Sequence, residues 1–184
     1  MASLHWREWA TDPEQLRRLD LLGKVPLFAG LSRRQLGKLL VKLFEKEYAP
    51  GETIFLEEEP GKALFIVLDG MVSIVHSGHG AEERVASLAR GAYFGELALI
   101  DDLPRSASAR ADEQSALLIL YKSHFDDLIE VHSTIAIRVM GNLLKALAGY
   151  VRAAHARSAD HAATLPGSAT ALEQGEKPLE RPDR

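Results

Sequence analysis

Short runs of β-branched, aromatic and aliphatic residues dominate the chain between Thr53 and Leu120, and turn-forming pairs separate them. Pro60-Gly61 and Asp69-Gly70 are two such pairs, and an Asp-Gly pair between apolar runs is a strong signal for a tight β-hairpin. Many short strands at close spacing predict an antiparallel β-barrel or β-roll. The predicted strands are Thr53–Leu56, Leu64–Leu68, Met71–His76, Val85–Leu88, Ser106–Ala111 and Ala116–Leu120.

Helical segments flank these strands on both sides. Asp12 before Pro13 is typical of a helix N-cap followed by proline, and Ser32 is expected to cap a second helix that Pro50-Gly51 ends with a turn. A last helix over about residues 133–157 carries an apolar stripe that must face the roll, a second chain or both. That stripe comprises Ile135, Val139, Met140, Leu143, Leu147 and Val151. The predicted fold is therefore mainly β, a jelly-roll-like antiparallel β-roll with an N-terminal helical motif and a long C-terminal helix.

Charge and cysteine content exclude several classes of function. The 184 residues include 26 acidic and 22 basic side chains, and this net charge of −4 excludes the whole-chain basic field typical of nucleic-acid binding. The absence of cysteine excludes disulfides, thiolate zinc sites and a cysteine nucleophile. No apolar run approaches the ~20 residues that span a bilayer, and the first ten residues lack the apolar core of a signal peptide. We therefore expect a cytoplasmic protein that binds neither membrane nor nucleic acid.

The segment 91–110, GAYFGELALIDDLPRSASAR, combines groups that suit a nucleotide. Gly95 precedes a short run of good helix formers, and the free N–H groups and dipole at a helix start favour an anion. Arg105 and Ser106 follow, and a guanidinium fork and a hydroxyl suit phosphate oxygens. Glu96 can accept a hydrogen bond from a sugar hydroxyl. Phosphate and ribose together indicate a nucleotide ligand.

The same segment resembles the phosphate-binding cassette of cyclic nucleotide-binding domains, the family that includes the catabolite activator protein and the regulatory subunits of protein kinase A. The match comprises FGELAL at 94–99 and PRSA at 104–107. Residues 22–43 resemble the family's N-terminal helical motif, and residues 50–70 resemble its second and third strands. We expect residues 21–157 to form this domain, residues 1–20 a partly helical extension, and residues 158–184 a mobile tail.

The resemblance implies a role for each cassette residue. Glu96 would hold the ribose 2′-hydroxyl, and Arg105 would pair with the exocyclic oxygens of the cyclic phosphate. Gly95 would let the backbone approach the ligand, and the backbone amides that line the anion would be those of Leu97, Ala98 and Ala107. Ser106 would reach the phosphate, and serine at this position favours cAMP over cGMP.

The base is expected to meet the long C-terminal helix. When the pattern of this helix is matched to that of the bacterial activator, Ala154 and His155 occupy the positions that contact the base. Ala154 offers no side-chain hydrogen bond, whereas His155 could accept one from the adenine 6-amino group or stack on the ring.

Two features depart from the family pattern. Glu58, within the turn Glu57-Glu58-Glu59, stands where the family usually has glycine, so a positive φ there would cost energy. We otherwise interpret this turn as solvated. The long helix is followed by no capped helix pair and no basic stripe, so we expect no helix-turn-helix domain and no binding to duplex DNA.

The resulting hypothesis is a cytoplasmic, non-enzymatic sensor of cAMP or cGMP that needs no cofactor. Ligand binding would move the C-terminal helix as a lid, the output would pass to an unknown effector protein, and that helix could also join two chains into a homodimer. The alternative is a ligand-free scaffold or interaction module on the same fold.

A second alternative is a metal-dependent enzyme of the cupin type, because His76 and His79 flank a Ser-Gly turn. Such enzymes need several histidines and a carboxylate on facing strands. The other histidines lie on predicted helices or near the ends of the chain, so we interpret His76 and His79 as part of a solvated hairpin.

Overall fold

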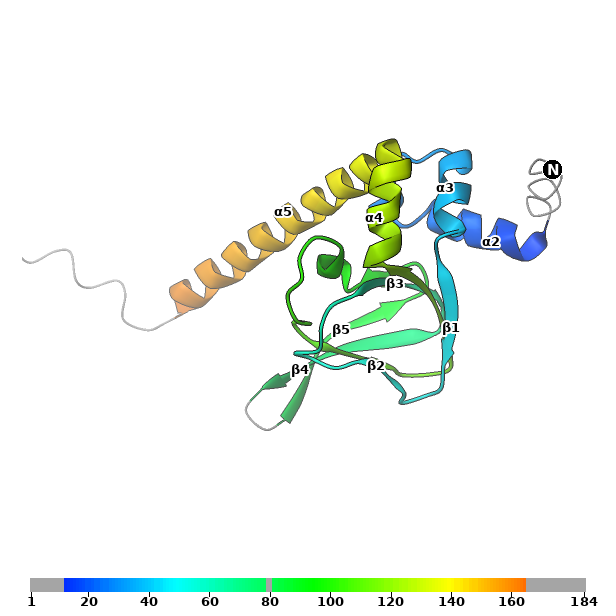
Figure 1. The fold of residues 1–184 in the computed structure, drawn as a ribbon. Helices are drawn as coiled ribbons and strands as arrows, with labels where there is room; N and C mark the ends of the chain where they lie inside the picture. The colour runs from blue at the N-terminus through cyan, green and yellow to red at the C-terminus, as the bar shows by residue number, and fades with distance from the viewer. Residues whose placement is uncertain (1–11, 79–80, 165–184) are drawn as a thin grey trace, which may run out of the picture. The chain divides into compact units, whose positions relative to one another are not determined.

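The computed structural model describes residues 12–78 and 81–164, and it has the predicted β-roll with flanking helices (Figure 1). Within the described residues, the helical elements are α2 (Pro13–Leu22), η1 (Pro26–Phe28), α3 (Arg33–Leu40), η2 (Glu96–Leu99), α4 (Lys122–Val131) and α5 (Ser133–Thr164), of which η1 and η2 are 3₁₀-helices. The strands are β1 (Phe44–Tyr48), β2 (Thr53–Phe55), β3 (Ala63–Asp69), β4 (Met71–Gly78), β5 (Ala81–Ala89), β6 (Tyr93–Phe94), β7 (Ser108–Ala111) and β8 (Ser115–Tyr121).

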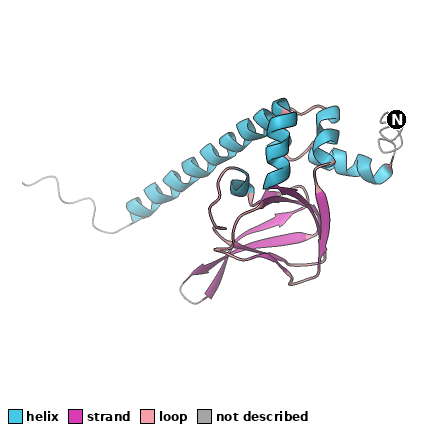
Figure 2. Cartoon of the chain, viewed as in Figure 1, coloured by secondary structure: helices cyan, strands magenta, loops and turns pink. Residues whose placement is uncertain are grey.

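Two antiparallel sheets face each other across the roll (Figure 2). Their strand orders are β1-β8-β3-β6 and β2-β7-β4-β5. In β3, which pairs with β6 and β8, every residue from Ala63 to Leu68 is buried, so both faces of this strand are covered. The core between the sheets includes Tyr48, Phe65, Val67, Val72, Phe94, Ala109, Leu117 and Ile119.

The two predicted helix caps are confirmed. Asp12 accepts a hydrogen bond from the backbone N–H of Glu14 at 3.0 Å, and Pro13 begins α2. Ser32 forms a capping box with Gln35 at the start of α3, so two backbone N–H groups that the helix leaves unpaired are satisfied reciprocally. Both caps are local signals, and both helices bury leucine-rich faces against the domain.

Strand β1 is a correction to the sequence analysis, which placed only a turn between the second helix and the strands. Phe44–Tyr48 pairs with β8 along its full length, although its first four residues are exposed. The strand lies at the edge of its sheet and contains three consecutive charged residues, Glu45, Lys46 and Glu47, so it lacks the apolar alternation that identifies a strand. Strand β6, only two residues long, was missed as well, and β7 begins at Ser108 rather than Ser106.

Helix α5 differs from its prediction in its length and in its apolar faces. It continues to Thr164, seven residues beyond Arg157, through a segment in which alanine, the best helix former, is frequent. The predicted stripe is divided, because Ile135, Val139 and Leu143 are buried while Met140 and Val151 are exposed.

The chain forms two compact units, residues 1–144 and 145–184. In the first unit, the Asn142 side chain of α5 donates hydrogen bonds to the carbonyls of Leu27 in η1 and of Ala29, the residue that caps it. The second unit contains the rest of α5. The proposed domain limits at residues 20 and 157 stay predictions, and residues 165–184 of the proposed tail lie outside the described residues.

Candidate functional site

Gly95 joins β6 to η2, as the sequence predicts for a glycine that feeds a short helix. Its backbone is left-handed, with φ +70°, a conformation that favours glycine. A Cβ atom at this position would lie 2.5 Å from Nη1 of Arg105 and 3.1 Å from the carbonyl oxygen of Ala63. Glycine is therefore favoured here by the backbone conformation and by the close approach of Arg105.

Arg105 is held beneath this turn by backbone carbonyls and aromatic rings. Its side chain is only 8% exposed. Nη1 donates to the carbonyl of Gly95 at 3.2 Å, and Nη2 donates to the carbonyl of Ala63 at 2.8 Å. The guanidinium carbon lies 4.1 Å from the ring centroid of Phe55 and 5.5 Å from that of Phe65, within cation–π range. The buried Nε has no hydrogen-bond partner.

Within the described residues, no carboxylate forms an ion pair with Arg105. Burial lowers the pKa of its guanidinium from the ordinary value, and the negative charges of Glu59 and Glu96 oppose that change. Arginine nevertheless remains protonated at neutral pH. The cassette thus contains a buried positive charge whose protein partners are neutral carbonyls and aromatic rings.

Glu96 is the first residue of η2, and its side chain is 9% exposed. Within the described residues it forms neither a salt bridge nor a side-chain hydrogen bond, so its carboxylate oxygens are available as acceptors. Its negative charge acts on the guanidinium of Arg105, which also contacts Gly95, so the structure brings these three predicted residues together. Of the other predicted cassette residues, Ala98 is buried, Ala107 is half-buried, and Leu97 and Ser106 are exposed.

His155, the predicted base contact, lies on α5 in the second compact unit, and its side chain is exposed. Its contact with the base stays a prediction.

The turn between β2 and β3 packs against the cassette through backbone hydrogen bonds. The amide of Glu58 donates to the carbonyl of Arg105 at 3.0 Å, and the amide of Arg105 donates to the carbonyl of Glu59 at 2.8 Å. Glu58 has φ +66° and is the only non-glycine residue with positive φ among those described. The strain expected where the family usually has glycine is therefore present, at a typical cost of about 1–3 kcal/mol.

Comparison with known proteins identifies the fold. The family model for the cyclic nucleotide-binding domain matches residues 45–132. The N-terminal domain of a transcriptional regulator from Streptomyces coelicolor superposes with a TM-score of 0.67 at 30% identity, over 73% of this chain and 94% of that one. The chain belongs to the cyclic nucleotide-binding domain family. This family consists of ligand-binding regulatory domains, and their ligand is cAMP or cGMP.

Two curated relatives contain this domain within longer proteins. The cyclic AMP receptor protein of Thermus thermophilus is 37% identical over 105 residues, which are 56% of this chain and 49% of the relative. A cAMP-dependent protein kinase regulatory subunit of Mycosarcoma maydis is 40% identical over 87 residues, which are 47% of this chain and 17% of the relative. The chain therefore spans less than half the length of these curated relatives.

Several residues that shape the cyclic nucleotide-binding cassette were missed by sequence reasoning. Phe55, Ala63 and Phe65 surround the Arg105 guanidinium, yet they precede it by 40 to 50 positions in the chain. Their types give no local signal, since two aromatic residues and an alanine in strands are ordinary core residues. Only the pairing of β2 with β7, and of β3 with β6, brings them beneath the cassette.

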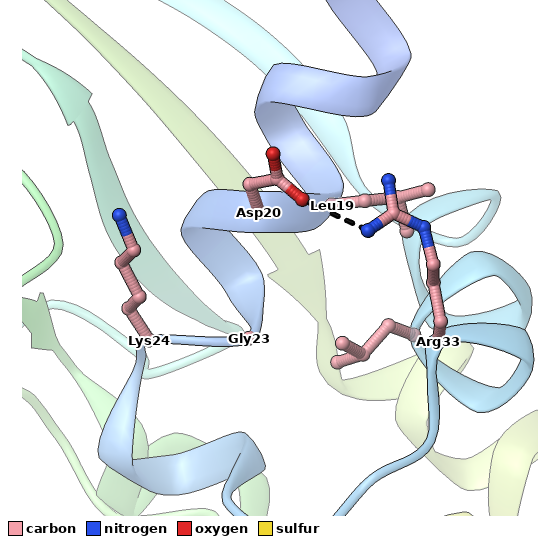
Figure 3. A pocket seen from close by; sticks show the side chains of 6 residues that line it. Leu19, Asp20, Gly23, Lys24 and Arg33 are labelled. Carbon is pink, nitrogen blue, oxygen red and sulfur yellow. Dashed lines mark hydrogen bonds and ion pairs between the residues drawn. The ribbon is translucent and has the colours of Figure 1, made fainter. Parts of the chain in front are cut away.

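A cavity of about 340 Å³ opens elsewhere in this domain, between α2 and α3 (Figure 3). Leu19 and Leu36 form its apolar part, and Lys24 lies at its rim. An ion pair between Arg33 and Asp20, with 3.0 Å between nitrogen and oxygen, crosses one side, and both side chains are about 60% exposed.

The histidine pair of the metal alternative is only partly described, because His79 lies outside the described residues. Among those that the structure describes, no group of three or more metal-ligating side chains is present. His76 pairs instead with Glu57, and the Glu57 side chain is only 14% exposed, so the interpretation of this turn as solvated is wrong at that residue. In the described part of the chain, no helix is long and apolar enough to cross a membrane.

Proposed function

We propose that this chain binds a cyclic nucleotide, cAMP in preference to cGMP, and acts as a regulatory binding module rather than an enzyme. The observation that carries the proposal is the buried guanidinium of Arg105, which lacks an anionic partner in the described residues. A buried charge is costly unless it is paired, so an arginine in this environment is suited to an anionic ligand.

The cyclic phosphate matches this site in charge and shape. It has one negative charge and two exocyclic oxygens, which a guanidinium fork can bind in a bidentate manner. The unpaired Nε of Arg105 supplies a further donor beside Nη1 and Nη2. The amides at the start of η2, including those of Leu97 and Ala98, add donors on the side of Gly95.

Glu96 and Ser106 supply the next elements of recognition. The buried carboxylate of Glu96 can accept a hydrogen bond from the ribose 2′-hydroxyl. The exposed hydroxyl of Ser106 can reach the phosphate, and the resemblance to the bacterial activator at this position supports a preference for cAMP. His155 remains the candidate base contact, and its replacement by alanine should lower cAMP affinity about fivefold and narrow the preference over cGMP.

The regulatory output is proposed to pass through α5 to a partner protein. A ligand shifts a conformational equilibrium only by its difference in affinity between two states, so closure of the cassette on the phosphate would have to favour one state of this helix. α5 continues from the first compact unit into the second, which makes it the element suited to carry such a change.

The exposed face of α5 also supports a homodimer. Ile137, Met140, Leu144 and Val151 are each at least 41% exposed, and their spacings of three, four and seven residues are those of a coiled-coil seam. Sedimentation of the full chain should therefore show a dimer that Leu144→Asp converts to a monomer. A wild-type monomer at the highest soluble concentration would contradict this part of the proposal.

A melting experiment tests the proposed function and separates it from the ligand-free scaffold. cAMP at about one hundred times its dissociation constant should stabilise the fold by about 2.7 kcal/mol, which is about 5–10 °C in melting temperature. 5′-AMP is the matched control, because it has the same base and sugar but an open, more highly charged phosphate. An unchanged melting temperature with both cAMP and cGMP would favour the scaffold.

A further inference from the structure

Glu57 and His76 lie outside the cassette, yet both are linked to it through the turn between β2 and β3. We propose that they form a positioning pair that holds Arg105 in place for an anion, so that cyclic nucleotide affinity depends on pH. This inference rests on the proposed function, since it concerns the affinity of the same site. It assigns a role to two residues that lie outside the cassette.

The Glu57 carboxylate links the turn between β2 and β3 to β4 through two contacts. One oxygen, Oε1, lies 2.7 Å from Nδ1 of His76, and the other, Oε2, accepts from the backbone N–H of Ser77 at 2.9 Å. The carboxylate is 14% exposed while the imidazole is 52% exposed, so the pair combines a shielded anion with a group that exchanges protons with solvent.

The backbone of the same turn forms hydrogen bonds with the cassette and with the start of β7. The amide of Glu57 donates to Oγ of Ser108 at 2.8 Å, at the start of β7. The next two residues of the turn form the two hydrogen bonds with the backbone of Arg105 described above. Arg105 is thereby held between two residues of the turn, and the turn is held by His76 and Ser77 of β4.

The charge of His76 is expected to determine how strongly Glu57 holds the turn between β2 and β3 against β4. Imidazole is the side chain that ordinarily changes charge between about pH 5 and pH 8. On β5, Glu83 is the cross-strand partner of His76, and Glu57 faces it from the turn. On β7, Ser108 pairs with Val75, the residue before His76, and it is uncharged. Both facing groups are carboxylates, and the imidazole forms an ion pair with them only when it is protonated.

Two other charged pairs lie nearby, and each is already satisfied. Arg110 of β7 pairs with Glu82, and Arg84 of β5 pairs with Asp112. Neither of these arginines pairs with Glu57, so His76 is the group whose protonation decides whether Glu57 has a positively charged partner. Affinity should then be higher with His76 protonated, and ligand binding should be accompanied by proton uptake.

The test is a calorimetric titration of the full chain with cAMP at about pH 6 and about pH 8. Because His76 is half exposed, we expect a modest effect, an affinity about two- to fivefold lower at the higher pH. Glu57→Gln and His76→Asn should each remove this difference, and the double variant should behave like either single one. His124→Asn is the matched control, because that imidazole lies against Phe44 and the carbonyl of Lys42, and it should retain the wild-type pH profile.

The outcomes separate this inference from the proposed function. If the wild-type chain binds neither cAMP nor cGMP at either pH, the proposed function is wrong and the inference is overturned with it. If the wild type and His76→Asn show the same dependence of affinity on pH, the inference alone is wrong. A loss of stability in Glu57→Gln without loss of the pH difference would likewise show a merely structural role.

Discussion

The cassette contains Arg105, and the cavity between α2 and α3 is lined by Arg33. These two arginines differ in their exposure to solvent and in their interaction partners. Arg33 at the cavity is exposed and already pairs with Asp20 at 3.0 Å. Arg105 in the cassette is 8% exposed, and its hydrogen bonds go to neutral carbonyls. A satisfied surface pair has little to gain from an added anion, whereas a buried cation without a counter-charge has much to gain. A buried arginine without a carboxylate partner is therefore better evidence for an anion-binding site than the volume of a cavity.

The largest effect should come from replacing the two arginines in parallel. Arg105→Leu should lower cAMP affinity by about 30-fold or more, because removal of one partner of a buried charged contact typically costs about 2–5 kcal/mol. The fold should survive, since an apolar side chain of similar size suits the space beside Phe55 and Phe65.

Arg33→Leu is the matched control, and it should leave cAMP affinity unchanged and stability within about 1 kcal/mol. Calorimetric titration and thermal melting of both variants measure these effects. Equal losses of affinity in the two variants would remove the distinction between the two regions.

A smaller effect is expected from Gly95→Ala. The added Cβ would displace the Arg105 guanidinium and adopt a strained backbone, so cAMP affinity should fall about tenfold and stability by about 1–3 kcal/mol.

Gly141→Ala on α5 is the control for the glycine substitution, since a Cβ there meets nothing within 4 Å. Alanine is the better helix former, so stability should rise by up to about 1 kcal/mol. Unchanged cAMP affinity in Gly95→Ala would show that the position of Arg105 does not limit binding.

The smallest effect is expected from Glu96→Gln, with a loss of about five- to tenfold in cAMP affinity. The amide oxygen can still accept from the ribose hydroxyl, but it lacks the charge that strengthens this bond. Titration with 2′-deoxy-cAMP completes the test, because the substitution should make little further difference when the hydroxyl is absent. A full effect of the substitution on the deoxy ligand would show that Glu96 does not recognise the ribose.

The features that the sequence predicted correctly are those that depend on neighbours along the chain. Asp12 and Ser32 cap helices through hydrogen bonds to residues two and three positions away, and Gly95 leads into a short helix, as the helix formers that follow it indicate. Membership of the family could be read from the cassette for the same reason, because its glycine, glutamate and arginine lie within eleven residues.

What the sequence did not predict depends on pairing between distant segments. β1 has an exposed and charged pattern, and only its register with β8 makes it a strand. Phe55 lies under Arg105 because β2 pairs with β7 across about fifty residues. The pair of Glu57 with His76 could not be found locally either, since the turn between β2 and β3 meets β4 only in the folded roll.

The most direct test of the central claim, that the cassette of this chain binds a cyclic nucleotide, is a calorimetric titration of the wild-type chain with cAMP and then with cGMP. The account predicts saturable binding of both, with one nucleotide per chain, tighter binding of cAMP, and competition between the two for the same site. No measurable heat from either nucleotide at millimolar concentration, confirmed by an unchanged melting temperature, would contradict it.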